Sequence, residues 1–564
     1  MSQPLSVVFC WHMHQPFYRE ADTGHYHLPW VYLHAIKDYT DMAVLLEQVD
    51  GARAVINYVP SLTEQIADYT LQLQAWLKGD IKHIPDALLD QLASPSGVYS
   101  AEERAFLLES CFRLNHERNL HRYADYSRLL QLMEHAKANA GLDYLSDAYF
   151  TDLVTWYHLG WLGETVRNSH ATAKRLFAKA RGFDQQDRHD LIALIAELLA
   201  DIPKLYKKLV EDGKIEISTT PYAHPIIPLM LDFSGATDTV PDALLPQEAY
   251  PGAKVRAKAH ISQAIDAHID YFGHKPTGCW PAEGAVSAET LALMAEAKFA
   301  WCATGETVLH HSRGFNIREH EPHDLYHPWL MGEKDSNIAC FFRDDHLSDL
   351  IGFEYSKWGT EDAVNNFMHE LAGIKHRSQG LKAPVVSIIM DGENAWEHFH
   401  ENGVHFLSQL YQAIADHDDY SMTTFEDYLK VNPADTYLEK MVPGSWVYGN
   451  FSTWIGDRAK TRAWELLIEV KHAFDAHSSK LSSQDLAEAE KQLSICEGSD
   501  WCWWFGDYNP SGAVRDFDNL YRQHLKKLYQ MLGLTAPTSL DENISQGGGD
   551  AEGGGAMRRG GAAE

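Results

Sequence analysis

Short apolar runs alternate with stretches of helical periodicity along the first 428 residues of the chain. The apolar runs are typical of buried strands, and the clearest are residues 6–10, 54–59, 215–217, 299–304, 337–342 and 383–390. Between them, apolar residues recur every three or four positions, as at Leu191, Leu194 and Leu198, which indicates amphipathic helices. Continuous apolar strands that alternate with helices favour a parallel α/β core. We therefore expect a barrel of βα units, with an open doubly wound sheet as the alternative.

Two regions depart from this alternation. Residues 94–188 are mostly helical in pattern, polar and rich in Tyr and His, which indicates a helical insertion into a barrel domain of residues 1–428. Beyond this point the strand patterns fade, and helices are expected at 457–477, 483–496 and 515–532. A C-terminal helical domain over 429–537 would complete the cleft. The glycine-rich tail, 538–564, has too few apolar residues to fold and is expected to be disordered.

Composition narrows the choice of partners. The chain has 564 residues, of which 45% are hydrophobic and 23% are charged, as in ordinary globular proteins. It carries 48 Lys and Arg against 79 Asp and Glu, so its formal net charge is −31. An acidic surface repels phosphate groups, which argues against nucleic acid and anionic membranes as partners. A neutral sugar remains compatible, and the 11% of aromatic residues suit sugar faces as well as protein cores.

The cysteines and the N-terminal residues indicate the cellular compartment in which the protein is expected. Seven cysteines are scattered along the chain, an odd number, and none forms a C-x-x-C pair. A disulfide framework is therefore not expected, and a reducing cytoplasm is favoured. The first 16 residues have neither a basic leader nor a long apolar stretch, so we expect a strand there and no signal peptide. No apolar window is long enough to predict a membrane-spanning helix. The oligomeric state is not predicted.

Polar and aromatic side chains follow the predicted strands. They stand in the segments 11–16, 218–225, 279–283, 343–349 and 391–397. Since parallel strands end at a common edge, we expect these side chains to meet there. Glu283 and Asp391 are the leading carboxylates, because a pair about 5–5.5 Å apart performs retaining glycoside hydrolysis and one roughly 6.5–9.5 Å apart favours inversion. The proton donor of such a pair needs a raised pKa.

Six segments resemble, in their order and spacing, the motifs of glycoside hydrolase family 57. They are 12–16, 216–225, 278–283, 391–394, 444–464 and 497–507. The last two are similar to the family's amylopullulanase and α-amylase-like branch, and the resemblance covers roughly residues 5–530. It implies an α/β fold, an incomplete (β/α)7 TIM-like barrel followed by a C-terminal α-helical domain. It also implies retaining action on an α-glucan, with α-1,4 and α-1,6 bonds as candidates, and no required metal or cofactor.

The resemblance also implies roles for single residues. Glu283 matches the nucleophile of a double-displacement mechanism, and Asp391 matches the general acid/base. His14 matches a sugar-contacting position, and His224 stands where some members have Glu. The further candidates for substrate binding are His12, Trp280, Arg343, Asp345, Asp349, Trp396, Trp454 and Trp504.

Most of these candidates also have a purely structural interpretation. A histidine or tryptophan at these positions could belong to the core, and Asp391 could cap a helix. We expect that His12 and His14 do not both turn their side chains to the cleft. Glu393 and Glu397 are expected to support the site or to face solvent.

Other functions are open at this point. A 4-α-glucanotransferase or branching enzyme would use the same two carboxylates with a sugar acceptor in place of water. A zinc-dependent enzyme, similar to α-mannosidases or polysaccharide deacetylases, would use His12, His14 and His224 with Asp344 or Asp345. Loss of activity on treatment with a chelator would favour this zinc-dependent alternative, although no H-E-x-x-H motif occurs. A non-catalytic glucan-binding protein is a third class, and the presence of both carboxylates argues against it.

Overall fold

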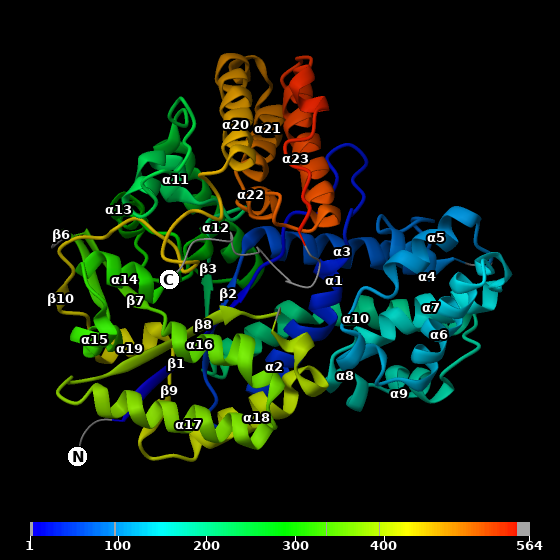
Figure 1. Ribbon diagram of the computed structural model, residues 1–564, viewed down its shortest axis with the longest axis horizontal. Helices are drawn as coiled ribbons and strands as arrows, with labels where there is room; N and C mark the ends of the chain where they lie inside the picture. The colour runs from blue at the N-terminus through cyan, green and yellow to red at the C-terminus, as the bar shows by residue number, and fades with distance from the viewer. Residues whose placement is uncertain (1–3, 95–96, 334–335, 394, 550–564) are drawn as a thin grey trace.

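Across the residues that the computed structural model describes (4–94, 97–333, 336–393 and 395–549), seven parallel strands curve into a central barrel (Figure 1). In sheet order they are β7 (Ser336–Phe342), β5 (Trp301–Thr304), β4 (Gly278–Cys279), β3 (Ile215–Thr219), β2 (Ala54–Tyr58), β1 (Leu5–Met13) and β8 (Val385–Asp391). A parallel bridge from Arg343, just after β7, to Ser387 in β8 joins the two ends of this row. The sheet is therefore the expected (β/α)7-type barrel and not an open doubly wound sheet.

Three shorter strands were not expected from the sequence. β6 (Trp329–Glu333) pairs antiparallel with β7, β10 (Thr436–Tyr437) extends β6, and β9 (Tyr420–Met422) pairs with the start of β1. Strands of two to five residues contain too little alternation to stand out from loops. They lie at the edges of the sheet and leave the order of the barrel strands unchanged.

The interior of the barrel is filled by apolar side chains from alternating strand positions. Val8 and Cys10 of β1 and Ile389 of β8 belong to this inner cluster. Phe425, from helix α19 (Phe425–Val431), packs against Trp301 and Phe341, with ring centroids 4.5 and 4.3 Å apart. One carboxylate is enclosed within this packing: Glu216 of β3 accepts a hydrogen bond from the indole N–H of Trp301 at 2.6 Å.

Helices cover the outer face of the sheet. They include α2 (Thr40–Gln48), α3 (Pro60–Lys78), α10 (Gln185–Glu211), α12 (Ala253–Phe272), α13 (Ala288–Glu296), α14 (Glu306–Arg313), α17 (Thr360–Arg377) and α18 (Val404–Ala415). α10 runs through Pro203 as a single helix. In the described part of the chain, none of the helices is both long and apolar enough to cross a membrane.

The region expected to be a helical insertion lies in the connection between β2 and β3. α4 (Ala87–Ala93) directly precedes it, and its own helices are α5 (Ala101–Ser110), α6 (Ala124–Ala138), α7 (Asp147–Gly160), α8 (Glu164–Ser169) and α9 (Ala171–Lys179). They lie together on one side of the barrel, at the right of Figure 1.

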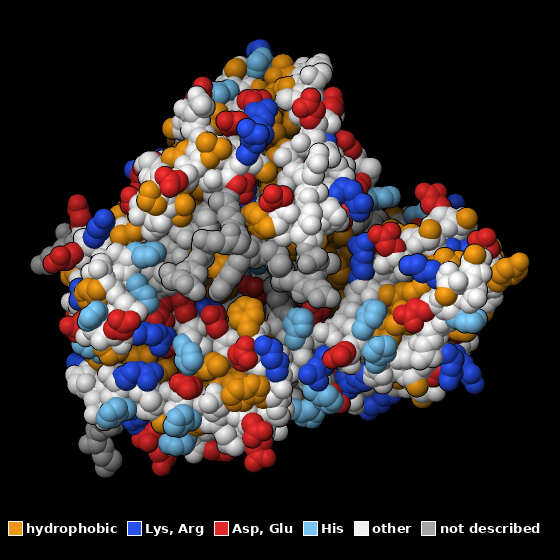
Figure 2. All heavy atoms as spheres, viewed as in Figure 1, with side chains coloured by type: hydrophobic (Ala, Val, Ile, Leu, Met, Phe, Trp, Pro, Cys, Tyr) orange, Lys and Arg blue, Asp and Glu red, His pale blue; other side chains and the backbone are white. Residues whose placement is uncertain are grey.

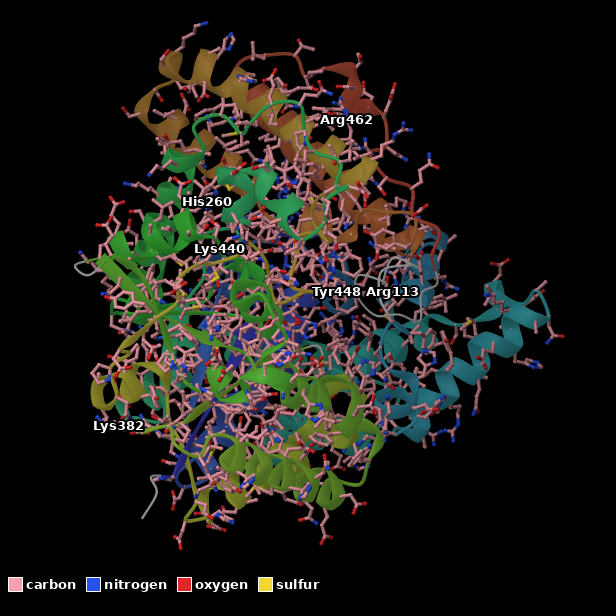
Figure 3. All side chains as sticks on the ribbon, turned by 60° about the vertical axis from the view of Figure 1, so that its left-hand side comes forward. Arg113, His260, Lys382, Lys440, Tyr448 and Arg462 are labelled. Atoms are coloured by element: carbon pink, nitrogen blue, oxygen red, sulfur yellow. The ribbon has the colours of Figure 1, made fainter. Side chains whose placement is uncertain are left out.

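The C-terminal helices stand on the barrel as a separate group, coloured orange to red in Figure 1. They are α20 (Arg458–His477), α21 (Ser483–Cys496), α22 (Asp500–Trp504) and α23 (Ser511–Met531). A buried ion cluster ties them to the barrel: Arg256 and His260 of α12 bind Glu497, each at 2.7 Å. His260 lies at the foot of these helices in Figure 3. The cluster fixes where the segment after α21 meets the barrel.

The start of the tail differs from the expectation. Leu540 is buried and its carbonyl accepts a hydrogen bond from Arg522 of α23, while Asp518 accepts one from the backbone of Ile544 at 2.7 Å. These two apolar residues precede the glycine run and supply the packing that the composition of the whole tail conceals. Disorder from residue 538 onward was therefore the wrong expectation for 538–549, and residues 550–564 lie outside the described part of the chain.

Candidate active site

Three histidine rings meet at the carboxyl end of the barrel. His12 points inward because Val8 and Cys10, at alternate positions of the same strand, point inward. Its ring centroid lies 5.7 Å from that of His14 and 5.3 Å from that of His224, and the His14 and His224 rings stack at 3.8 Å. The expectation that His12 and His14 do not face the same side was wrong, because residues two apart on a strand share a face.

The orientation of His12 is fixed by Asn57 of β2. The amide group of Asn57 donates to Ser218 at 3.0 Å, so its Oδ1 faces the site and accepts from Thr220 at 2.9 Å and from His12 Nδ1 at 2.7 Å. An amide oxygen only accepts, so Nδ1 of His12 carries the proton and Nε2 has the lone pair. Burial and the repulsion of His14 lower the pKa of His12 to about 3, and the hydrogen bond with Asn57 opposes this shift to a smaller extent. His12 is therefore neutral at pH 7.

His224 sits in a strained turn after β3. Its φ is +60° and that of Ala223 is +59°, a region that residues other than glycine seldom adopt. Ser499 holds this turn: its Oγ lies 2.9 Å from His224 Nδ1, and its backbone N–H donates to the His224 carbonyl at 3.1 Å. Burial, and then the neighbouring histidines, lower the pKa of His224 far below its ordinary value. Strain of this kind is usually found at functional sites.

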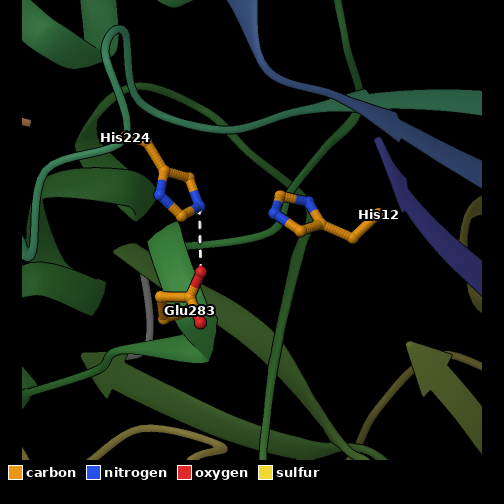
Figure 4. Close-up of side chains that lie close together, drawn as sticks. All are labelled: His12, His224 and Glu283. Carbon is orange, nitrogen blue, oxygen red and sulfur yellow. Dashed lines mark ion pairs between the residues drawn. The ribbon is translucent and has the colours of Figure 1, made fainter. Parts of the chain in front are cut away.

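Glu283 lies on the short turn after β4 and is also left-handed, with φ of +56°. Its side chain is 11% exposed, and the indole N–H of Trp446 donates to its Oε2 at 2.9 Å. Its Oε1 lies 3.6 Å from Nε2 of His224, as Figure 4 shows. Burial and the charge of Asp391 raise the pKa of Glu283 to about 8, against the opposing hydrogen bond from Trp446. Glu283 is therefore mostly protonated in the free site at pH 7.

Asp391 is the last residue of β8 and pairs in register with His12 of β1. Ile389, two residues earlier, belongs to the inner cluster, so Asp391 points toward the mouth of the barrel. Gly392 follows it directly, and a Cβ at this position would lie 2.1 Å from Sδ of Met13. A side chain at position 392 would therefore have to displace the Met13 side chain. The charge of Asp391 contributes to the raised pKa of Glu283, as expected for two carboxylates at the same end of a barrel.

Two more acids support this group. Asp500, the first residue of α22, accepts a hydrogen bond from His14 Nε2 at 2.7 Å. Glu393 is buried and accepts from Gln15 at 3.1 Å and from the backbone of His14 at 3.3 Å. Burial and the charge of Asp391 raise the pKa of Glu393. Glu397 is half-buried and lies 3.6 Å from His398.

The arginine segment after β7 forms one edge of the site. Arg343 donates to Asp345 at 2.7 Å, to Asp349 at 2.6 Å and to the carbonyl of Ile389 at 2.7 Å. Its guanidinium lies 5.4 Å from the ring centroid of Trp446, the residue that holds Glu283. Arg343 therefore joins β7, β8 and Trp446, and its own donors are taken up by the protein. Burial raises the pKa of Asp345 to about 6, although Arg343 lowers it.

Trp280 and Trp396 are both inside the protein. Trp280 is fully buried in the inner cluster, where it packs edge-on against Trp446 at 5.1 Å. Trp396 is 1% exposed, packs edge-on against Trp11 at 5.6 Å and donates its indole N–H to the carbonyl of Gly392 at 2.9 Å. Neither ring presents a free face in this structure, so their expected stacking on sugar has no support from the packing.

Trp454 and Trp504 belong to the region where the C-terminal helices meet the barrel. Trp454 is buried, and its ring centroid lies 5.8 Å from that of Trp503. Trp504 is half-buried and stacks on Phe517 of α23 at 5.1 Å. Trp504 and Trp503 keep part of their surface accessible, and Trp454 does not.

Metal-binding side chains also converge here. Within the described residues, the His12, His224 and Glu283 group and the His14, His224 and Asp500 group each bring three possible ligand atoms within 4.8 Å of one another. Asp344 and Asp345 are absent from both groups, since Asp344 pairs with Arg318 at 2.8 Å and Asp345 pairs with Arg343. The histidine part of the zinc alternative thus comes together, and its aspartates lie elsewhere.

Several residues of the site were missed from the sequence: Asn57, Trp446, Ser499 and Asp500. Trp446 and the Ser499–Asp500 pair lie within the motif segments 444–464 and 497–507, but nothing in those segments distinguishes them from the neighbouring aromatic and polar residues. Asn57 carries the signal that could have found it, since it is a polar residue inside an otherwise apolar run that is buried throughout β2. A buried amide in a core strand needs partners, and here they are site residues.

Comparison with known proteins agrees with this fold. A branching enzyme from Thermococcus kodakaraensis has a TM-score of 0.58 at 14% identity, over 93% of this chain and 90% of that chain. A branching enzyme from Pyrococcus horikoshii has a TM-score of 0.57 at 15% identity, over 95% and 93%. The α-amylase AmyC from Thermotoga maritima has a TM-score of 0.56 at 13% identity, over 96% of each chain. At these identities the likeness concerns the fold.

No curated protein sequence matches the chain directly. The model of glycosyl hydrolase family 57, however, matches residues 8–443, a stretch that contains both Glu283 and Asp391. With a match over most of its length and the fold of these neighbours, the chain belongs to glycosyl hydrolase family 57.

Proposed function

We propose that the protein is a retaining enzyme that acts on α-glucans, with Glu283 as nucleophile and Asp391 as general acid/base. The observation that carries the proposal is the pair itself: two carboxylates from different strand ends, close enough for one to raise the pKa of the other. Retaining glycosidases use such a pair as nucleophile and general acid/base, and barrel enzymes carry their catalytic groups at the carboxyl ends of the strands. The neutral sugar also fits the acidic surface of the chain.

The proposed reaction has two displacements. In the first, a carboxylate oxygen of Glu283 bonds to the anomeric carbon, the bond from that carbon to the leaving oxygen breaks, and Asp391 gives that oxygen its proton. In the second, Asp391 takes a proton from water or from a sugar hydroxyl, whose oxygen displaces Glu283 from the anomeric carbon. Two inversions restore the original configuration.

The proton state of the free site constrains this mechanism. A pKa near 8 places a proton on Glu283 at pH 7, yet attack requires Glu283 ionised and Asp391 protonated. The pair therefore has to hold one proton and pass it to Asp391 as the substrate binds, because coupled carboxylates titrate as a unit. Trp446, whose indole N–H donates to Glu283, is the group placed to favour its ionised form.

The acceptor decides the class of product. Water gives an α-amylase or amylopullulanase, which is our first choice because the segments 444–464 and 497–507 resemble that branch. A sugar hydroxyl gives a branching enzyme or 4-α-glucanotransferase, and the likeness to two branching enzymes keeps this second candidate in view.

The test incubates the protein with maltoheptaose, amylose and pullulan and separates the products by size. Shorter oligosaccharides alone indicate hydrolysis, longer ones indicate transfer, and maltotriose from pullulan indicates cleavage of α-1,6 bonds. Glu283→Ala and Asp391→Ala should each lower kcat by several orders of magnitude while circular dichroism stays unchanged. Near-normal turnover in either variant rejects the role of that residue. Chelator treatment should leave turnover intact, and loss of activity would favour the zinc alternative.

A further inference from the structure

We propose that His12, His224 and Glu283 form a binding site for a transition-metal ion such as Zn²⁺, and that the bound ion inhibits the enzyme. The inhibitory half of this inference rests on the proposed function, because it assumes that Glu283 is the nucleophile. The binding half stands on the geometry of the three side chains alone.

The first argument is the arrangement of the three ligand atoms. They lie within 4.8 Å of one another, and Nε2 of His224 is 3.6 Å from Oε1 of Glu283. In a tetrahedral zinc site with bonds of about 2.0–2.1 Å, neighbouring ligand atoms are roughly 3.3–3.4 Å apart. The separation of His224 and Glu283 is already near this value. Figure 4 shows the two rings and the carboxylate turned toward the same space.

The second argument is that the two imidazole nitrogens are buried without a hydrogen-bond partner. His12 is 1% and His224 is 0% exposed, and Nε2 of each has no hydrogen bond among the described residues. A buried polar atom without a partner carries a free-energy cost, which a ligand can remove. Both unpartnered atoms belong to the same three-residue group, so one ion satisfies both.

The third argument is the support behind the ligands. Asn57 Oδ1 accepts from His12 Nδ1 at 2.7 Å, and Ser499 Oγ lies 2.9 Å from His224 Nδ1. Metal-binding histidines are usually held in this way, with the far nitrogen bonded to an oxygen so that the near one presents its lone pair. Asn57 is itself fixed by Ser218 and Thr220, so the orientation of the His12 ring is built into the barrel.

The donor set selects the class of metal. Two imidazoles and one carboxylate suit Zn²⁺ and similar transition metals, and they leave a fourth position open. Mg²⁺ and Ca²⁺ prefer sites made only of oxygen atoms, so they should not compete. The neighbouring His14, His224 and Asp500 group is less suitable, because His14 and Asp500 are already bonded to each other at 2.7 Å.

A bound ion would occupy the carboxylate that attacks the sugar. Oε1 of Glu283 would then be a metal ligand, and its lone pair would not be free for the anomeric carbon. Binding of the metal and turnover should therefore exclude each other, and removal of the ion by a chelator should restore activity.

The experiment measures metal binding directly, on the full-length protein after treatment with a chelator and dialysis. Zn²⁺ is titrated by calorimetry into wild type, His12→Gln, His224→Gln and Asn57→Ala. The matched control is His323→Gln, since Glu321, His323 and Asp324 form a more exposed group of one histidine and two carboxylates. Circular dichroism of each variant monitors folding, and Co²⁺ absorption of the wild type reports four-coordinate binding independently of any variant.

We expect one tight Zn²⁺ site in wild type and in His323→Gln. Asn57→Ala should weaken it by roughly 10–100-fold, as loss of a supporting partner does, and the two ligand variants should weaken it more. Absence of a four-coordinate Co²⁺ spectrum in wild type, or Zn²⁺ binding that survives both ligand variants and is lost in His323→Gln, overturns the proposal.

Activity separates this inference from the proposed function. If wild type cleaves or transfers α-glucans and Zn²⁺ neither binds nor inhibits, the metal inference fails and the proposed function stands. If Zn²⁺ binds as expected and no glucan is turned over, the metal site stands while the proposed function and the inhibitory role fall together.

Discussion

Glu283 combines three features that each raise the free energy of the folded state. It is non-glycine in a left-handed conformation, it is buried, and its carboxyl faces a second one. Each of these features opposes folding, and the surroundings hold them in place: Trp446 bonds both to the Glu283 side chain and, through its backbone N–H, to the Glu283 carbonyl at 3.1 Å. Residues 283 and 446 thus form one unit, and its properties can be tested by substitution.

Glu283→Gln should stabilise the protein more at pH 7 than at pH 5. The folded-state pKa of about 8 lies above the ordinary 4.5, so wild type keeps its full stability only below pH 4.5 and loses it as pH rises to 8. Gln cannot ionise and avoids this loss, which is on the order of 3 kcal/mol at pH 7 and less than about 1 kcal/mol at pH 5. Urea unfolding at both pH values measures the difference, and an equal effect at both contradicts the assignment.

Trp446→Phe should move the alkaline limb of the pH–rate profile to higher pH. The carboxylate pair works only while it holds one proton, so kcat/KM should fall as pH rises through about 8 in wild type. The indole N–H stabilises the ionised form of Glu283, and its removal raises the pKa further. Initial rates from pH 5 to 10 test this. A limb that stays in place, or moves to lower pH, excludes Glu283 as its origin.

At the scale of elements, the loop between α21 and α22 brings side chains of the C-terminal helices to the histidines of the barrel. Glu497 anchors this loop to α12, and Ser499 and Asp500, two and three residues later, reach His224 and His14. Gly498 lies so near the strained turn that a Cβ there would come within 2.8 Å of the carbonyl oxygen of Ala223. The histidines of the barrel are therefore positioned by helices that lie more than 200 residues away in the chain.

Arg256→Met should destabilise the protein and misplace this loop. Burial alone would raise the pKa of Glu497, but Arg256 and His260 lower it to about 2, so the carboxylate is charged and depends on them. Removal of one partner from a buried ion pair costs about 3–5 kcal/mol. The midpoint temperature of thermal unfolding and kcat should both fall.

The control for Arg256→Met lies on the same helix. Lys258 pairs with Glu296 at 2.6 Å, and both side chains are about half exposed, so Lys258→Met should change stability little. If the two variants behave alike, the buried cluster does not have the structural role that we give it.

At the scale of the whole molecule, the barrel strands could be predicted from the sequence, but the long-range contacts that close the barrel and complete the site could not. Strands such as β8 are continuous apolar runs, and a run of this kind carries its own signal. The bridge from Arg343 to Ser387 and the contact of His14 with Asp500 join residues 44 and 486 positions apart, and no local pattern encodes such pairs. The proposed roles of Glu283 and Asp391 rest on motif resemblance, whereas the effect of Asp391 on the pKa of Glu283 follows from the folded chain.

The net charge of −31 leads to a last prediction about the substrate. Acidic side chains are spread over the face in Figure 2 among lysines and arginines, so charge does not create a local site for an anion there. A neutral glucan should then bind with a KM that changes by less than about twofold between 50 and 500 mM NaCl, although screening shortens the reach of the field from about 14 Å to about 4 Å. The affinity for a charged polymer would instead change steeply over this range, because salt screens its attraction to or repulsion from the protein. Initial rates with maltoheptaose at both salt concentrations decide the matter, because a large change in KM would point to a charged substrate and away from an α-glucan.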